Sequence, residues 1–154
     1  MRCIVLDAMG VLFHAADDVV DMLIPFIREH GGDAESVPAA YLEASLGTMD
    51  PDEFWRTVGL DPSVEDAYLS RHSLMPGVLS RSQHARIPVW CLSNDVGRWS
   101  MKLRRRFALD GLLAGAVISS DVRRAIGEYF GRLLSEDEAE RLAELMRRLL
   151  EQPT

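Results

Sequence analysis

Three groups of small polar residues could do chemistry, and each group directly follows a short apolar run. The first is the carboxylate Asp7, the second is Ser93-Asn94-Asp95, and the third is Ser119-Ser120-Asp121. A carboxylate held at an exposed turn can act as a nucleophile, and hydroxyl groups and backbone amides can hold an anion beside it. Carboxylates are also ligands that Mg²⁺ accepts in proteins. We therefore take these three groups as the candidate site.

The apolar runs before these groups predict strands that would bring the groups together. They are Cys3–Leu6, Pro88–Leu92 and Ala114–Ile118, and a helical pattern follows each of them. A continuous apolar run of this length suits a strand that is buried on both faces of a parallel sheet. Ligands of such sheets bind beyond the carboxyl ends of the strands, where the three polar groups would lie.

A long helical segment, residues 15–73, separates the first two strands. Apolar residues recur in it at helical spacing up to Gly31-Gly32, and further helices are predicted over 38–45 and 51–58. Asp50-Pro51 resembles a helix start, because proline is favoured at the first helical position. The segment is too long for an ordinary loop, so we expect a small helical cap over the end of the first strand.

The segment Asp7-Ala8-Met9-Gly10-Val11-Leu12-Phe13 resembles the first motif of the haloacid dehalogenase (HAD) superfamily. Leu92-Ser93-Asn94-Asp95 resembles the second motif, and residues 117–121 resemble the start of the third. Leu74-Met75-Pro76-Gly77-Val78 is similar to the turn that leads from cap to core in that family. The resemblance extends to about residue 122. It implies a hydrolase in which an aspartate attacks phosphorus or carbon and forms an aspartyl intermediate.

The chain departs from the family pattern in three places. The family usually has a second acid, which protonates the leaving group and later activates water, but Met9 stands there and can do neither. Val122-Arg123-Arg124 stands where the family has a lysine, and a planar guanidinium does not replace a compact ammonium at a tight site. A fourth strand that ends in Mg²⁺-binding aspartates is missing, because the pattern over 128–152 is polar and helical.

The resemblance implies a role for each residue of the candidate site. The small polar residues could instead cap helices, as these residue types do in any protein. A bound Mg²⁺ is implied as cofactor, and the missing acidic pair argues against it. The implied substrate is a small anionic or halogenated molecule. The implied catalytic residues are Asp7, Ser93 and Arg123, the substrate-binding residues are Met9, Gly10, Asn94 and Asp95, and the metal ligands are Asp7 and Asp121.

Met9 leaves three interpretations open. Dehalogenase-like members of the family also lack an acid at this position, because a halide leaves without a proton, and a halogenated substrate removes the strict need for Mg²⁺. The loss of several catalytic parts together instead favours a weakly active or inactive enzyme, a pseudoenzyme. The third interpretation is a non-catalytic module whose C-terminal helices or edge strand bind a partner. For the chain as a whole, a truncated or rearranged gene product is a further alternative.

Together these patterns predict an α/β fold of reduced size. We expect a HAD-like, Rossmannoid three-layer core from residues 1–14 and 74–154, with a helical cap from residues 15–73. Without a fourth strand, Cys3–Leu6 becomes an apolar edge that invites pairing with another chain. We expect two amphipathic C-terminal helices, predicted over 122–152, to cover this flank, or a homodimer to close it.

The composition of this chain argues against some classes of binding partner. The 154 residues carry a net charge of -7 and no concentrated basic face, which argues against nucleic acid. No apolar run approaches the roughly 18 residues of a membrane span. Cys3 and Cys91 lie in apolar runs, so we expect buried free thiols in a cytoplasmic protein. The histidines have no metal-ligand spacing, and we take them as surface or cap residues.

Overall fold

The computed structural model describes residues 3–15, 17–77 and 87–123. The chain divides into two compact units, residues 1–121 and 122–154, and every strand and helix named below belongs to the first unit. The helices expected toward the C-terminus, from residue 124 on, lie outside the described residues, as does the segment searched for a fourth strand.

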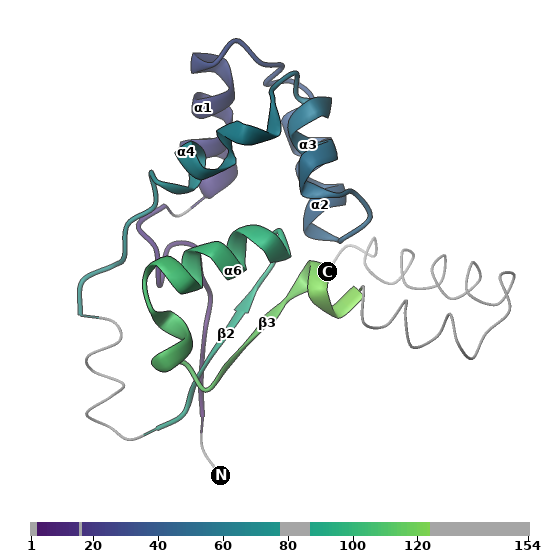
Figure 1. Ribbon diagram of the computed structural model, residues 1–154. Helices are drawn as coiled ribbons and strands as arrows, with labels where there is room; N and C mark the ends of the chain where they lie inside the picture. Colours follow the sequence, from purple (N-terminus) through teal and green to yellow (C-terminus); the bar gives the residue numbers. More distant parts are fainter. Residues whose placement is uncertain (1–2, 16, 78–86, 124–154) are drawn as a thin grey trace, which may run out of the picture. The chain divides into compact units, whose positions relative to one another are not determined.

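Three short strands form one parallel sheet in the order β1-β2-β3 (Figure 1). They are β1 (Ile4–Leu6), β2 (Val89–Ser93) and β3 (Gly115–Ile118). The three predicted strands and the α/β class are therefore confirmed. The register pairs Leu6 with Cys91 and Ser93 with Ile118. As a result, Asp7, Ser93 and Ser119 all lie at the carboxyl edge of the sheet.

Only one face of the sheet is buried. Along β2 the side chains of Val89, Cys91 and Ser93 are buried, and they alternate with exposed Trp90 and Leu92. Within the described residues a packed core therefore lies on one side of the sheet, and the burial expected on the second face is not found there, because strand side chains alternate between the two faces. The exposed apolar side chains of the strands are Val5 (56% exposed), Leu92 (54%), Trp90 (39%) and Val117 (38%).

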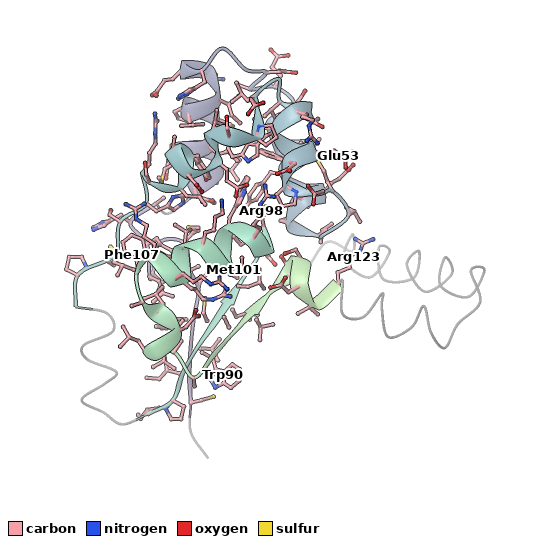
Figure 2. All side chains as sticks on the ribbon, in the orientation of Figure 1. Glu53, Trp90, Arg98, Met101, Phe107 and Arg123 are labelled. Carbon is pink, nitrogen blue, oxygen red and sulfur yellow. The ribbon has the colours of Figure 1, made fainter. Side chains whose placement is uncertain are left out.

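The buried face shares a core with helix α6 (Gly97–Arg106), which follows β2. Trp99 and Leu103 of this helix are almost fully buried in that core. A short helix, η3 (Leu109–Gly111), leads from α6 to β3. Figure 2 shows Trp90 away from α6, whereas Arg98 extends from α6 toward the insert.

The insert between β1 and β2 is helical, as predicted. Asp50 caps one helix by accepting a 2.8 Å hydrogen bond from Asp52 N, with proline at the first turn, which confirms the predicted helix start. The last two helices of the insert were not predicted, because each is too short to show a helical period. The helices are η1 (Val19–Leu23), α1 (Ile24–Glu29), α2 (Val37–Ser45), α3 (Pro51–Thr57), η2 (Pro62–Val64) and α4 (Glu65–Leu69).

A buried carboxylate fastens the insert to α6. Glu65, only 3% exposed, accepts hydrogen bonds from Trp55 Nε1 at 3.2 Å and Trp99 Nε1 at 2.8 Å. Arg98 donates to the same oxygen from Nε at 3.1 Å, and Lys102 Nζ lies 2.7 Å from the other oxygen as an ion pair. Arg98, Trp99 and Lys102 belong to α6, whereas Glu65 is the first residue of α4. The Glu65 side chain therefore joins the insert to a helix that is distant in sequence.

One expectation about a single residue changes. Cys91 is buried and Cys3 is exposed, so the expected burial holds for one thiol and is wrong for the other, although both are free. Trp55 and Trp99 are buried in the core, whereas Trp90 is 39% exposed. In the described part of the chain, no helix combines the length and the apolar character that crossing a membrane requires.

Candidate functional site

Asp7 lies exposed at the first position after β1, at the start of a tight turn. The turn closes when the amides of Leu12 and Phe13 both donate to the Ala8 carbonyl at 2.9 Å. Gly10 has a φ of +71°, a conformation that favours glycine. Buried Leu12 and Phe13 anchor the turn in the core, so that the Asp7 carboxylate stays at the surface. This is the exposed carboxylate that the sequence predicted.

Around Asp7, the turn supplies no second acid. Met9 is half-buried and packs against the core, and its backbone pairs with that of Phe13. The Ala8 amide donates to Asp7 Oδ1 at 2.7 Å, so that this amide is already engaged. Whether Met9 and Gly10 contact a substrate stays a prediction.

The turn after β2 exposes one of its three polar residues. Ser93 is 5% exposed and Asp95 is 2% exposed, whereas Asn94 is exposed. Asp95 Oδ1 accepts from the Val96 amide at 2.7 Å, and the Asp95 amide donates to Ser119 Oγ at 3.1 Å. The amides of Asp95 and Val96, which we had expected to help hold an anion, therefore already have acceptors within the protein.

Ser120 supplies the oxygen that caps α6. Its Oγ accepts from the Gly97 amide at 2.7 Å and donates to the Asp95 carbonyl at 3.0 Å. A methyl group on Gly97 would overlap the Asp121 carboxylate, so Asp121 lies against the first turn of α6. This position suits an acid, because the N-terminal end of a helix carries partial positive charge. The N-cap residue itself is Val96, whose side chain makes no capping hydrogen bond, so the capping oxygen comes from the turn after β3 and not from the residues directly before the helix.

The neighbouring hydroxyl joins the sheet to the insert. Ser119 Oγ donates to the Ser45 carbonyl at 2.6 Å, at the end of α2. From the same helix, the Tyr41 hydroxyl donates to the Asn94 carbonyl at 3.3 Å. The end of α2 is therefore tied to the turns after β2 and β3, beside the candidate site.

Two carboxyl groups near this site are buried. Asp18, at the start of η1, is 6% exposed and accepts from the Tyr68 hydroxyl at 3.4 Å. Burial raises the pKa of Asp18 to about 6. Burial, with the charges of Asp18 and Asp121, also holds the pKa of Asp95 well above its usual range. At neutral pH these buried groups therefore favour protonation far more than an exposed carboxyl does.

Tyr41 lies where the acidic side chains converge. Burial raises the pKa of its hydroxyl, and the negative charges of Asp95, Asp18, Asp17 and Asp7 raise it further. Tyr41 therefore stays a neutral hydrogen-bond donor beside the site. Sequence reasoning missed Tyr41 and Asp18, because neither belongs to a motif and both reach the site only through the fold of the insert.

The electrostatics of the site disfavour a multiply charged anion. Asp7 is close enough to Tyr41 to act on its hydroxyl, and Asp95 experiences both Asp18 and Asp121 as like charges. Arg104 of α6 partly offsets these charges at Asp95. A dianionic substrate would therefore require a cation to accompany it, whereas a halogenated monoacid carries less charge into the site.

The remaining predicted site residues are the metal ligands Asp7 and Asp121 and the catalytic residue Arg123. Among the described residues, no three His, Cys, Asp or Glu side chains form a group that could hold a metal ion. Asp7 and Asp121 thus join no such group there, and their role as Mg²⁺ ligands stays a prediction. Arg123 is exposed and belongs to the second unit, so its catalytic role stays a prediction.

Neither the models of known protein families nor the curated proteins match this chain. The resemblance to the HAD superfamily therefore depends on the sequence motifs around Asp7, Ser93 and Asp121 alone.

Proposed function

We propose that this chain is a HAD-like hydrolase scaffold in which Asp7 remains the nucleophile and the later hydrolytic step is impaired. The observation that carries the proposal is the position of Asp7. It is an exposed carboxylate at the carboxyl edge of a parallel sheet, held by a turn with buried anchors. Ligands of open α/β sheets bind at this edge.

The strand order supports the proposal. The HAD resemblance implies that the second-motif strand lies beside the first-motif strand, and β2 pairs directly with β1 in parallel. This pairing places Ser93 one strand away from Asp7 at the same edge. The finer HAD-like architecture and the cap assignment of residues 15–73 remain part of the proposal.

The proposed chemistry has two steps, and Met9 affects them differently. In the first step an Asp7 oxygen attacks phosphorus or carbon, and the bond to the leaving group breaks with its electron pair on that group. A weakly basic leaving group such as p-nitrophenolate or chloride needs no proton, so Met9 does not block this step. In the second step water must attack the aspartyl intermediate and release Asp7. Without a neighbouring acid to activate that water, the intermediate should accumulate.

The test is pre-steady-state kinetics with p-nitrophenyl phosphate and with 2-chloropropionate, each with and without Mg²⁺. We expect a burst of p-nitrophenolate or chloride, close to one equivalent per chain, followed by slow turnover. Asp7→Asn should abolish the burst, whereas Glu53→Gln, which removes an exposed acid from α3, should retain it. A burst of equal size in Asp7→Asn would overturn the proposal. The Mg²⁺ arm separates phosphatase from dehalogenase chemistry.

A second candidate is an interaction module that forms a homodimer. Within the described residues, β1 is an edge of the sheet, and Val5 of this strand is 56% exposed. Such an edge can pair with the same edge of a second copy. Light scattering at rising concentration should then show a dimer that Val5→Lys dissociates. A monomer throughout would exclude this candidate.

A further inference from the structure

The insert is joined to the sheet through two short connecting segments that run antiparallel to each other. The outgoing segment contains Leu12, Phe13 and His14, and the returning segment runs from residue 72 to 75. The His14 amide donates to the Ser73 carbonyl at 3.1 Å, and the Met75 amide donates to the Leu12 carbonyl at 2.8 Å. Phe13 and Leu74 form an antiparallel bridge between them. We call this two-stranded connection the joint.

His72 is the buried residue at the start of the returning segment. It is 3% exposed, and among the described residues neither ring nitrogen has a hydrogen-bond partner. Its ring meets the Phe13 ring edge-on at 5.9 Å and the Tyr68 ring edge-on at 5.2 Å. Sequence spacing gave no sign of this burial, since we took the histidines as surface or cap residues.

These surroundings tolerate a neutral ring and oppose a charged one. Burial lowers the pKa of His72, the nearby Leu69 carbonyl partly offsets this, and the Arg106 guanidinium lowers the pKa further. That carbonyl is itself engaged, because it accepts a 2.8 Å hydrogen bond from Arg106 Nη1. A protonated ring would thus carry a positive charge beside an arginine, and it would share the Leu69 carbonyl with Arg106 as an acceptor.

We propose that His72 makes the joint between insert and sheet sensitive to acid. The neutral ring packs between Phe13 and Tyr68 and holds the two segments together. The protonated ring leaves this place for water, and the hydrogen bonds of the joint open. Mild acid thereby loosens the attachment of the insert, and with it the contacts that α2 makes beside Asp7.

The sign of the effect follows from the pKa. Because the pKa of His72 in the closed joint lies below its ordinary value of 6.5, the open state binds the proton more strongly. The closed state is fully favoured above pH 6.5 and loses stability as the pH falls toward the lowered pKa. For each pKa unit by which the closed joint lowers the pKa of His72, the population of the open state increases up to tenfold between high and low pH.

The charged groups around the joint determine in which variant the acid effect of His72 can be measured alone. Arg106 of α6 acts directly on His72, and Arg71 precedes it on an exposed site paired with Glu29. Asp18 accepts a hydrogen bond from the Tyr68 hydroxyl, and its pKa of about 6 lies between the two pH values of the experiment. Its protonation is favoured in the folded state, so its effect on stability has the opposite sign. An Asp18→Asn background removes this second titration.

The experiment is hydrogen exchange of the His14 and Met75 amides in the full chain at pH 7.5 and 5, corrected for intrinsic exchange rates, in the Asp18→Asn background. We expect faster opening at pH 5 at these two amides and little change in β2. His72→Phe, which fits the aromatic surroundings and cannot be protonated, should remove the acid effect. His14→Gln, a change of an exposed histidine in the same joint, should retain it.

A second measurement does not depend on any variant. The His72 ring signal in the unsubstituted protein should titrate below 6.5 by NMR. A midpoint at or above that value would overturn the proposal. Equal acid-dependent opening in His72→Phe and in the unsubstituted joint would overturn it as well.

Discussion

Replacing Glu65 by Gln should cost a large part of the stability of this protein. The substitution keeps the volume of the side chain, so it creates no cavity and changes only charge and hydrogen bonding. Glu65 is 3% exposed and receives the Nε1–H groups of Trp55 and Trp99, both of which are themselves buried. Arg98 and Lys102 supply its two ion pairs.

The magnitude follows from what Gln cannot do. A neutral amide presents one oxygen and one NH₂ group. The NH₂ group would therefore face N–H donors that now bind a carboxylate oxygen. Leaving a buried donor without an acceptor costs about 1–3 kcal/mol, and breaking a buried ion pair by removing one partner costs about 3–5 kcal/mol. Arg98 and Lys102 are about one-third exposed and regain water, so we expect a loss of about 3 kcal/mol. For a chain of this size, that loss lowers Tm by roughly 6–12 °C.

The assay is thermal and urea unfolding at pH 7, with Asp66→Asn as the matched control. Asp66 pairs with the same Lys102, but its side chain is 81% exposed, so its loss should change the free energy of unfolding by less than about 0.5 kcal/mol. Equal effects of the two substitutions would refute the reasoning, because they would show that burial of the Glu65 network contributes nothing.

Four further predictions concern single residues. Asp18→Asn should make the protein about 3 kcal/mol more stable at pH 7. Because the pKa of Asp18 is raised in the folded state, the unsubstituted chain loses stability as the pH rises from 3.8 to about 6, and a neutral amide avoids that loss. Urea unfolding of both proteins across this pH range checks the prediction. Ser120→Ala should cost about 1 kcal/mol by removing the oxygen that caps α6. Gly97→Ala should push the Asp121 carboxylate away from α6 at a cost of at most about 1 kcal/mol, because the overlapping atoms are the ends of side chains, and both losses can be read from unfolding curves. Met9→Asp should raise steady-state turnover by up to about 10²-fold while leaving the burst unchanged, if activation of water limits the rate.

The sequence predicted the elements of the sheet correctly, because each strand is a continuous apolar run that ends in small polar residues. It also predicted the start of α3, because Asp50-Pro51 carries both the capping oxygen and the proline of a helix start. It could not show that one face of the sheet stays exposed. Apolar residues at Val5, Trp90 and Leu92 look the same in sequence whether a helix covers them or not.

The candidate site was predicted only in part. Asp7 could be found, because its chemistry and its place after a strand appear together in the sequence. Tyr41 and Asp18 could not, because the folding of the insert brings them to the strand ends from positions without a motif. The role of Ser120 as the cap of α6 joins residues 23 positions apart, which local patterns do not reveal.

The central claim is that Asp7 is a nucleophile, and the most direct measurement is mass spectrometry of the covalent intermediate. The protein would be acid-quenched during the burst with p-nitrophenyl phosphate or 2-chloropropionate, and the peptide that contains Asp7 would then be sequenced. Our account predicts a phosphoryl or carboxyethyl group on Asp7, which is absent from Asp7→Asn. Product formation with Asp7 unmodified, or with the group on another residue, would contradict it.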